Sequence, residues 1–268
     1  MNKQGKLVNG KVVGGIEWVK TVLGPSVEIQ GYTSNPIGGC PHKCRWEMPD
    51  GTIAECYAEN VAENVAMSAY PNGFSAHYWN PKEMQKWHPI KEPKRIFMGS
   101  MTDWMSLNVS DDEIRQVIGQ MQEAGQHTFM TLTKNAPRLL KFKNEIRATQ
   151  NLWVGVSAPP SFMFGQRLSL IQQVKMIDRQ MKVLSELETA IAWMSAEPLS
   201  CNIRPFLYHN ARLDWVVIGA ASNGRKTYQP KPEWVTELHT WADERGVPVF
   251  HKGNLAENGW TRREDFPK

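Results

Sequence analysis

Long hydrophobic runs are missing from this sequence. The longest wholly apolar stretch runs from Trp215 to Ala221 and is far shorter than the roughly 18 residues that a membrane-spanning helix needs. The first residues include scattered lysines but no apolar core of about 7–15 residues and no small-residue cleavage site, which argues against a secretory signal. We therefore expect no association with a membrane and a protein that stays in the cytoplasm.

Cysteine is scarce, with 4 residues in a chain of 268. So few cysteines exclude a disulfide scaffold, which a reducing cytoplasm would not maintain in any case. Their placement is more informative, because Cys40, Cys44 and Cys56 lie close together in the sequence whereas Cys201 stands alone. We expect Cys201 to be a small, half-buried thiol.

An excess of one charge is missing too. Lys and Arg number 31 and Asp and Glu 27, which leaves a formal charge of only +4. This excludes a protein that binds nucleic acid mainly through bulk electrostatics, although it permits a local basic groove. The chain also has none of the usual sequence signatures of P-loop nucleotide hydrolases, dinucleotide-binding enzymes, zinc proteases or serine hydrolases.

What the sequence does contain is a regular alternation of short β-type runs and longer helical segments. The runs are rich in β-branched and aromatic residues and nearly continuous in apolar character, which is typical of parallel strands that are buried on both faces. The predicted strands are Val27–Tyr32, Arg95–Gly99, His127–Thr133, Leu152–Ser157, Ile191–Ala196, Trp215–Gly219 and Val247–His251.

Repeated βα units in one uninterrupted series predict a single α/β domain over residues 1–268, with an excursion around residues 71–93. We expect a partial or closed (β/α) barrel of about six to seven parallel strands. A doubly wound open sheet is the second choice, because the pattern alone does not give the strand order. The predicted helices are Cys56–Ser68, Asp111–Ala124, Pro137–Ala148, Gln166–Leu187 and Pro232–Arg245.

Polar side chains follow nearly every predicted strand. In (β/α) barrels the active site forms at the carboxyl ends of the strands, so we expect these side chains to share one rim. The ionisable members of the set are costly to bring together unless they pair or bind a ligand. The set comprises Asn35, Ser100, Thr102, Asp103, Lys134, Ser157, Glu197, Ser222 and Lys252.

The three clustered cysteines lie on the loop after the first predicted strand. Thiolates are soft ligands for iron–sulfur clusters and zinc, and the C-x3-C spacing of Cys40 and Cys44 lets two of them face one centre. Asp50-Gly51 predicts a tight turn, and a small hairpin there would return Cys56 to the same place. Three cysteines would leave one iron of a [4Fe–4S] cluster open for an outside molecule. A Cys3His zinc site completed by His42 and unrelated free thiols are the alternatives.

Several separate segments together resemble one family. They are the cysteine loop and the strand-end segments Phe97–Asp103, Thr131–Lys134, Asn151–Ser157, Ser195–Leu199, Asp214–Gly219 and Phe250–Lys252. In this order, over about Gly15 to Leu255, the sequence is similar to the three-cysteine-motif, radical-SAM-like family common in bacteriophage genomes, a domain of unknown function. If a phage encodes the protein, the expected cytoplasm is that of the host cell.

The resemblance implies a radical-SAM-like partial barrel with a [4Fe–4S] cluster on Cys40, Cys44 and Cys56 and S-adenosylmethionine on the open iron. In radical-SAM proteins generally, an electron from an external donor reaches the cofactor through the cluster. The cofactor is then cleaved to methionine and a 5′-deoxyadenosyl radical, which abstracts a hydrogen from the substrate. The protein positions the cofactor and excludes water.

The resemblance also implies roles for the strand-end residues. Ser157 and Glu197 would meet the ribose or amino group of the cofactor, and Lys134 would neutralise its carboxylate or a substrate anion. Lys134 and Glu197 are therefore the predicted catalytic residues. The residues predicted to bind the cofactor are Gly99, Ser100, Thr102, Asp103, Ser157 and Glu197.

The sequence departs from the family pattern in three places. The usual spacing is C-x3-C-x2-C with an aromatic residue just before the third cysteine, whereas here eleven residues separate Cys44 from Cys56 and Glu55 holds that place. Ala221 stands where many members have Glu, and Ser106 stands where many have His. The cluster prediction survives these changes, but a reaction identical to that of other members is not implied.

We therefore predict a radical-SAM enzyme of unresolved class that acts on a nucleotide, a modified DNA base or a related metabolite. Its expected partners are this small-molecule or nucleotide substrate, DNA as a further candidate, and an external electron donor. The loop around Arg225 and Lys226 suits phosphate contacts. The alternatives are a non-catalytic, zinc-stabilised nucleic-acid-binding or phage partner protein, and a metal-free barrel lyase or isomerase that uses Lys134 and Glu197.

Overall fold

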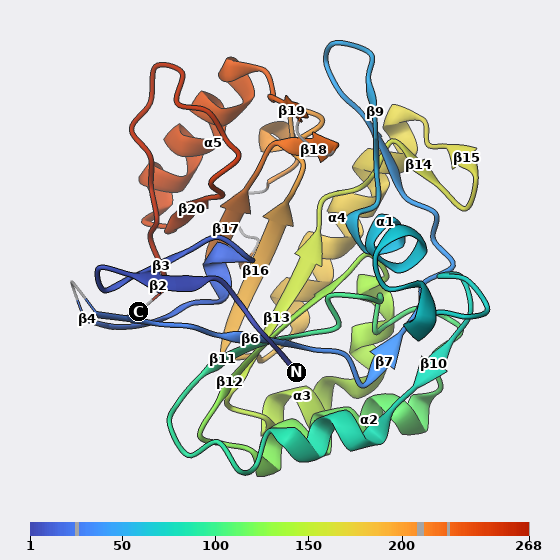
Figure 1. Ribbon diagram of the computed structural model, residues 1–268. Helices are drawn as coiled ribbons and strands as arrows, with labels where there is room; N and C mark the ends of the chain where they lie inside the picture. The colour runs from blue at the N-terminus through green and yellow to red at the C-terminus, as the bar shows by residue number, and fades with distance from the viewer. Residues whose placement is uncertain (25–26, 208–211, 224–225, 268) are drawn as a thin grey trace.

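The computed structural model describes residues 1–24, 27–207, 212–223 and 226–267. A large, mostly parallel sheet forms its centre (Figure 1). Only β1 runs against its neighbour, β6, and all later neighbours are parallel. The eight strands, in their order across the sheet, are β1 (Asn2–Lys3), β6 (Tyr32–Ser34), β11 (Arg95–Met98), β12 (Thr128–Thr133), β13 (Leu152–Ser157), β16 (Ile191–Ala196), β17 (Trp215–Ile218) and β20 (Val249–His251).

The parallel strands follow one another across the sheet in the order in which they occur in the chain. Parallel crossovers are right-handed, so an unbroken order winds the connections along one face. A doubly wound sheet reverses its order at a switch point, and this alternative is therefore wrong. Strands β1 and β20 are the two edges of the sheet, and no pairing among the described residues closes it into a barrel.

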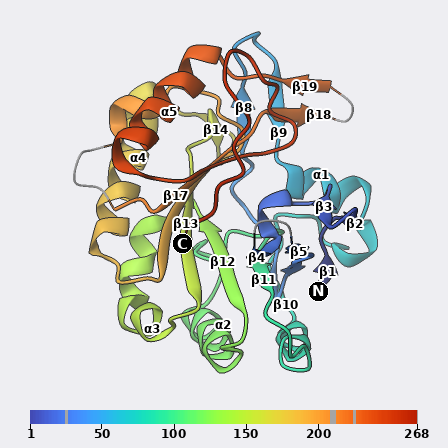
Figure 2. The same ribbon diagram turned by 90° about the vertical axis from the view of Figure 1, so that its left-hand side faces the viewer.

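The connecting helices cover one face of the sheet (Figures 1 and 2). They are α2 (Asp111–Glu123), α3 (Lys143–Ala148), α4 (Leu170–Glu186) and α5 (Pro232–Arg245). Helix α2 begins with the capping box that its sequence predicts, in which the Ser110 hydroxyl accepts the backbone N–H of Glu113 and the Glu113 carboxylate accepts that of Ser110. A second capping box, of Ser169 and Gln172, starts α4.

Two predicted helices differ from the observed ones. The segment predicted as a helix from Gln166 begins instead with β15 (Gln166–Arg167), and the cap at Ser169 delays the start of α4. The segment predicted as a helix from Pro137 is mostly a 3-10 helix, η4 (Ala136–Phe142), before the short α3. The N–H groups in the first turn of a helix have no acceptor within the helix. Pro137, which has no N–H, therefore fits this position.

Smaller elements surround the sheet. The helix predicted for Cys56–Ser68 is α1 (Tyr57–Asn64) followed by a short 3-10 turn. The excursion around residues 71–93 contains β10, which pairs with β7, and η3. The remaining elements are β2 (Lys6–Val8), β3 (Lys11–Val13), η1 (Glu17–Val19), β4 (Thr21–Gly24), β5 (Val27–Ile29), β7 (Ile37–Gly38), β8 (Arg45–Glu47), β9 (Ile53–Glu55), η2 (Met67–Ala69), β10 (Tyr78–Trp79), η3 (Pro81–Lys86), β14 (Phe162–Met163), η5 (Arg204–Phe206), β18 (Ala221–Asn223) and β19 (Lys226–Tyr228).

The predicted first strand, Val27–Tyr32, is wrong. Its first residues form β5, which pairs with β4 in a separate two-stranded sheet, and β6 of the central sheet begins only at Tyr32. Gln30 and Gly31 lie between the two strands, and an added Cβ at Gly31 would lie 2.2 Å from the carbonyl oxygen of Val19. Only glycine fits this close backbone approach, at the point where the predicted strand is divided between two sheets.

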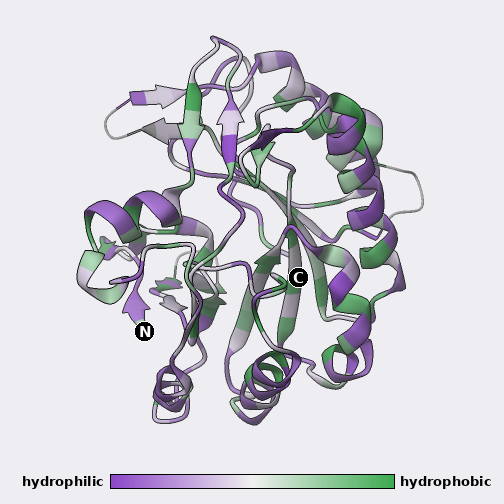
Figure 3. Cartoon of the chain, turned by 90° about the vertical axis from the view of Figure 1, so that its right-hand side faces the viewer, coloured by the Kyte–Doolittle hydropathy of each residue, from purple (hydrophilic) through white to green (hydrophobic). Residues whose placement is uncertain are grey.

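Both faces of the central sheet are buried by different segments. Alternate strand residues pack under the helices in one large core, while the others form a second cluster with Trp18 and Val19 of η1. The ring of Trp193 lies over Gly155 of β13, where an added Cβ would come within 2.4 Å of the indole. Figure 3 shows hydrophobic residues along the central strands and hydrophilic ones on the outer helices. None of the helices in the described ranges has the length and apolar character to cross a membrane.

Two histidines form a buried pair between α5 and β20. The Nε2 atoms of His239 and His251 are 2.7 Å apart, and the side chains are 6% and 1% exposed. Burial lowers the pKa of each imidazole to about 4. Both rings are therefore neutral at pH 7, and one Nε2–H donates to the other nitrogen.

We expect this pair to make the fold sensitive to acid. The folded pKa values lie below the ordinary value of 6.5, so the unfolded chain binds more protons between about pH 6.5 and 4, and stability is lost as the pH falls through this range. The midpoint of thermal unfolding should fall from pH 7 to pH 5, and should fall less in His239→Phe. An equal or larger fall in the variant would contradict this prediction.

Candidate functional site

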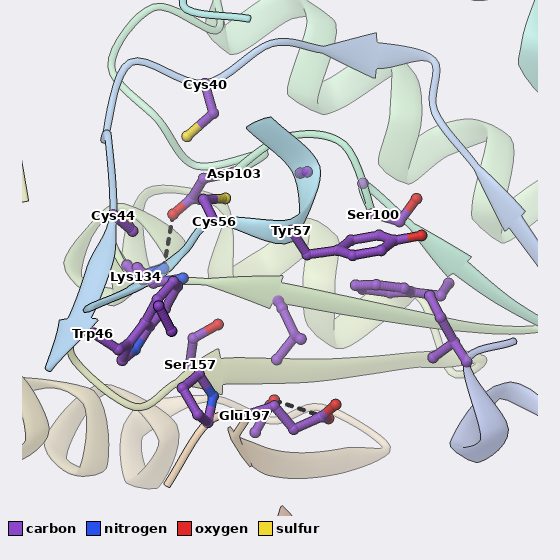
Figure 4. Close-up of a pocket in the computed structure, with 18 of the residues that line it drawn as sticks. Cys40, Cys44, Trp46, Cys56, Tyr57, Ser100, Asp103, Lys134, Ser157 and Glu197 are labelled. Atoms are coloured by element: carbon purple, nitrogen blue, oxygen red, sulfur yellow. Dashed lines mark hydrogen bonds between the residues drawn. The ribbon is translucent and has the colours of Figure 1, made fainter. Parts of the chain in front are cut away.

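A pocket of about 370 Å³ opens at the carboxyl ends of the parallel strands. Loops after β11, β12, β13 and β16 form its floor, and the cysteine loop and the N-terminal segment form its walls (Figure 4). The structure brings every residue of the predicted site to this pocket. These residues are Cys40, Cys44, Cys56, Gly99, Ser100, Thr102, Asp103, Lys134, Ser157 and Glu197.

The hairpin predicted at Asp50-Gly51 places two of the cysteines. Strands β8 and β9 pair with Arg45 opposite Glu55 and Glu47 opposite Ile53, and Gly51 turns the chain with a φ of 81°. One step beyond the Arg45 and Glu55 pair, this register puts Cys44 opposite Cys56. The eleven residues between the two cysteines thus leave them side by side at the open end of the hairpin.

The third cysteine is held by the turn that follows β11. The backbone N–H of Gly39 donates to the carbonyl oxygen of Met101 at 3.0 Å, and the Thr102 hydroxyl donates to the carbonyl oxygen of Gly39 at 2.7 Å. The next residue, Cys40, donates its own N–H to the carbonyl of Phe74 at 2.8 Å. Thr102 therefore helps to fix Cys40 in the pocket wall.

Asn35 connects the same turn to the end of β6. Its Oδ1 accepts the backbone N–H of Met101 at 2.9 Å, and its side chain exchanges hydrogen bonds with the Ser100 hydroxyl at 3.1 and 3.2 Å. Gly99 begins the turn with a φ of 85°, a conformation that glycine adopts without strain. The residues predicted to meet a cofactor here thus have protein partners that shape the turn.

Asp103 joins the turn after β11 to the end of β12. Its carboxylate is 6% exposed and accepts the Thr133 hydroxyl at 2.6 Å, the backbone N–H of Lys134 at 2.8 Å and that of Met105 at 3.1 Å. His42 Nδ1 lies 3.5 Å from the same carboxylate. Burial lowers the pKa of His42, so the ring is neutral at pH 7. Asp103 therefore holds the loops of the pocket floor together through its hydrogen bonds.

Lys134 extends from the end of β12 toward the cysteines. Its ammonium lies 5.6 Å from the centre of the Trp46 ring and makes no ion pair or hydrogen bond among the described residues. Burial alone would lower the pKa of Lys134, but the three thiols and Asp103 raise it above the ordinary value. The side chain is therefore a cation that faces the cysteines without a direct anionic partner.

The thiols of Cys40 and Cys44 are protonated in the protein by itself. Burial raises the pKa of Cys40 to about 12 and that of Cys44 to about 11. In the described ranges, no three His, Cys, Asp or Glu side chains converge closely enough to hold a single metal ion. The Cys3His zinc alternative thus gains no support, because His42 contacts Asp103 and the Phe164 ring instead.

The residues fit a cluster better than a single ion. The cysteines of a [4Fe–4S] cluster bind different irons, so they need not meet at one point. Three thiols from two chain segments line one pocket, and Lys134 would supply a cation for the negative charge of a thiolate-bound cluster. Loss of the thiol protons would accompany metal binding.

Glu197 lies at the end of β16 with a partner that the sequence did not indicate. Its carboxylate oxygens lie 3.1 Å from the ammonium of Lys252 and 3.2 Å from the Ser195 hydroxyl, which donates to it. Glu197 raises the pKa of Lys252, and burial opposes this effect. The metal-free alternative requires Glu197 to act with Lys134, but the ion pair of Glu197 is with Lys252.

Other features of the pocket are less visible in the sequence. The N-terminal segment contributes Gln4, Gly15, Ile16 and Trp18. In the sequence, only the glycines of this segment indicate an unusual backbone conformation. Ser157 lines the pocket between the two charged ends (Figure 4). Cys201 lies away from it, half-buried against the hydrophobic core as expected. Arg225 of the predicted phosphate-binding loop lies outside the described residues.

Comparisons with known proteins give one family and two similar structures. Residues 24–264 match the family model described as "Protein of unknown function (DUF5131)". A variant of spore photoproduct lyase has a similar structure, with a TM-score of 0.50 and 8% sequence identity over 80% of this chain and 74% of that one. Streptococcus suis SuiB, bound to its precursor peptide SuiA, gives a TM-score of 0.45 and 11% identity over 83% of this chain and 48% of that one. None of the curated proteins has a significantly similar sequence.

The lyase is a radical-SAM enzyme. At 8% identity, the likeness to the lyase shows a common fold and nothing about the substrate. The expected α/β fold with a large, mostly parallel sheet is thus confirmed, and the lyase has a similar architecture. The phage origin and the three-cysteine motif of the resembled family gain no support from these matches.

Proposed function

Because this chain belongs to the family described as "Protein of unknown function (DUF5131)" and folds like a radical-SAM enzyme, we propose that it is a radical S-adenosylmethionine enzyme. In this proposal Cys40, Cys44 and Cys56 hold a [4Fe–4S] cluster, S-adenosylmethionine binds beside it, and an external donor supplies the electron. The substrate is a nucleotide, a modified base in DNA or a related metabolite.

One observation carries the proposal. The thiols of Cys40, Cys44 and Cys56 line a single pocket at the carboxyl ends of the parallel strands, and the ammonium of Lys134 enters the same pocket with no ion pair among the described residues. A buried charge without a counter-ion is costly. An anionic group held by the cysteines would provide the missing partner.

The chain's own residues prepare the site. When bound, the cluster would transfer the electron that cleaves S-adenosylmethionine and so generates the radical. Asp103 fixes the backbone of Lys134, and the stacked position of the lysine over Trp46 keeps its charge near the cysteines. The hairpin of β8 and β9 and the N-terminal segment wall the pocket, which limits the access of water to a reactive species.

Anaerobic reconstitution with iron and sulfide tests the proposal. We expect a brown protein with about four irons per chain that releases 5′-deoxyadenosine from S-adenosylmethionine when a reductant is added. A sample without reductant provides the control, because cleavage requires the electron. A colourless protein with one zinc per chain, or an iron-loaded protein that leaves S-adenosylmethionine intact, would reject the proposal.

A further inference from the structure

The end of the pocket away from Cys40 contains an ion pair with unused hydrogen-bonding capacity (Figure 4). One oxygen of Glu197 accepts the Ser195 hydroxyl and the other lies 3.1 Å from the Lys252 ammonium. Each carboxylate oxygen has a further lone pair, and the ammonium has further N–H groups. The pair therefore presents an acceptor and a donor side by side to the pocket.

The fold holds Glu197 and Lys252 close together. Glu197 and Lys252 follow β16 and β20, the two strands that flank β17, so their side chains meet across the backbone of Gly219. An added Cβ at Gly219 would lie 2.9 Å from Cγ of Glu197 and 3.4 Å from Cβ of Lys252. Any other residue at this position would push the two side chains apart.

This end is separate from the cysteine end. Lys252 forms its ion pair with Glu197, whereas the Lys134 ammonium lies over the ring of Trp46 in the cysteine hairpin. The pocket thus has two distinct polar ends. If the cysteine end takes the cofactor, the other end is left for a second molecule.

Aromatic side chains also line the pocket. They include Trp18, Tyr57 and Phe97, and Figure 4 shows the Tyr57 ring beside Cys56. Aromatic walls favour a flat ligand.

We propose that Glu197 and Lys252 form the substrate-recognition subsite and bind the hydrogen-bonding edge of a nucleobase, the carboxylate accepting a ring or amino N–H and the ammonium donating to an adjacent ring nitrogen or carbonyl oxygen. This inference rests on the proposed function, because it takes the bound nucleobase to be part of the enzyme's substrate. A phosphate would meet repulsion from Glu197, and a lone cation would meet it from Lys252. A base edge offers a donor and an acceptor in one plane, as the pair and the aromatic walls of the pocket require.

Calorimetric titration with guanosine, adenosine, cytidine and thymidine tests the subsite, with the reconstituted protein saturated with S-adenosylmethionine. We expect at least one nucleoside to bind without displacing the cofactor. Glu197→Gln and Lys252→Met should each weaken that binding about tenfold or more, because the first makes the acceptor neutral and the second removes the charged donor. Lys252→Arg, which keeps the charge, should lose less than Lys252→Met.

Glu145→Gln, on the exposed face of α3, is the matched control and should bind the nucleoside like the wild type. If no nucleoside binds, if S-adenosylmethionine displaces every one that does, or if the two pocket variants bind as well as the control, the subsite is wrong. Free α-amino acids serve as a second probe, and their binding in place of nucleosides would also overturn it. Iron content and cofactor cleavage by the wild type test the proposed function separately. If the protein does not take up iron, nucleoside titration of the protein as purified still decides the subsite.

Discussion

Replacing Cys44 by Ala is expected to lower the iron bound on reconstitution from about four per chain to nearly none and to abolish cleavage of S-adenosylmethionine. Cys44 occupies the middle of the ligand set. It faces Cys56 across the hairpin register and is close enough to act electrostatically on Cys40 as well. With this ligand removed, the two remaining thiols hold too few irons to assemble the cluster.

Cys201→Ala is the matched control for this experiment. Cys201 is also half-buried, and burial raises its pKa to about 11, but it lies against the hydrophobic core away from the pocket. We expect this variant to load iron and cleave the cofactor like the wild type. Iron and sulfide analysis with the visible spectrum gives the result, and a Cys44→Ala protein that keeps its cluster would show that the ligands are elsewhere.

The central strands could be predicted because the apolar character that buries each strand is visible in its own residues. Leu152–Ser157 and Ile191–Ala196 are apolar over nearly their whole length, and both appear at the predicted bounds. The segment from Val27 to Tyr32 instead alternates apolar and polar residues up to Gln30, and it is divided between two sheets beside a close backbone contact at Gly31. That contact joins segments distant in the chain, and no periodicity within the run reveals it.

The location of the candidate site could also be predicted, because parallel strands place their carboxyl ends at one edge. What could not be predicted is which side chains pair there. The metal-free alternative has Lys134 and Glu197 act together, but the strand order puts Lys252 beside Glu197 and leaves Lys134 with the cysteines. Such pairings depend on register across strands that are not neighbours, which the sequence pattern does not contain.

The strand-end residues divide into two kinds once their partners are known. In the first kind, the side chain hydrogen-bonds to the backbone of the pocket loops, as in Asn35, Thr102 and Asp103. In the second kind, represented by Lys134, the ammonium makes no such bond among the described residues. The first kind is expected to govern folding and loop position, and the second to govern ligands. A substitution in each kind should therefore separate stability from metal binding.

Asp103→Ala is the change expected to cost most stability, about 3–5 kcal/mol, because it strands three donors that each cost about 1–3 kcal/mol when buried without a partner. These donors are the Thr133 hydroxyl and the backbone N–H groups of Lys134 and Met105. Urea unfolding should show the loss as a lower midpoint with an unchanged slope. Asp243→Ala removes an exposed carboxylate paired with Arg263 and should cost about 1 kcal/mol or less. Equal losses in the two variants would contradict a central role for Asp103, since the difference between them measures what burial and three converging donors add to a single carboxylate.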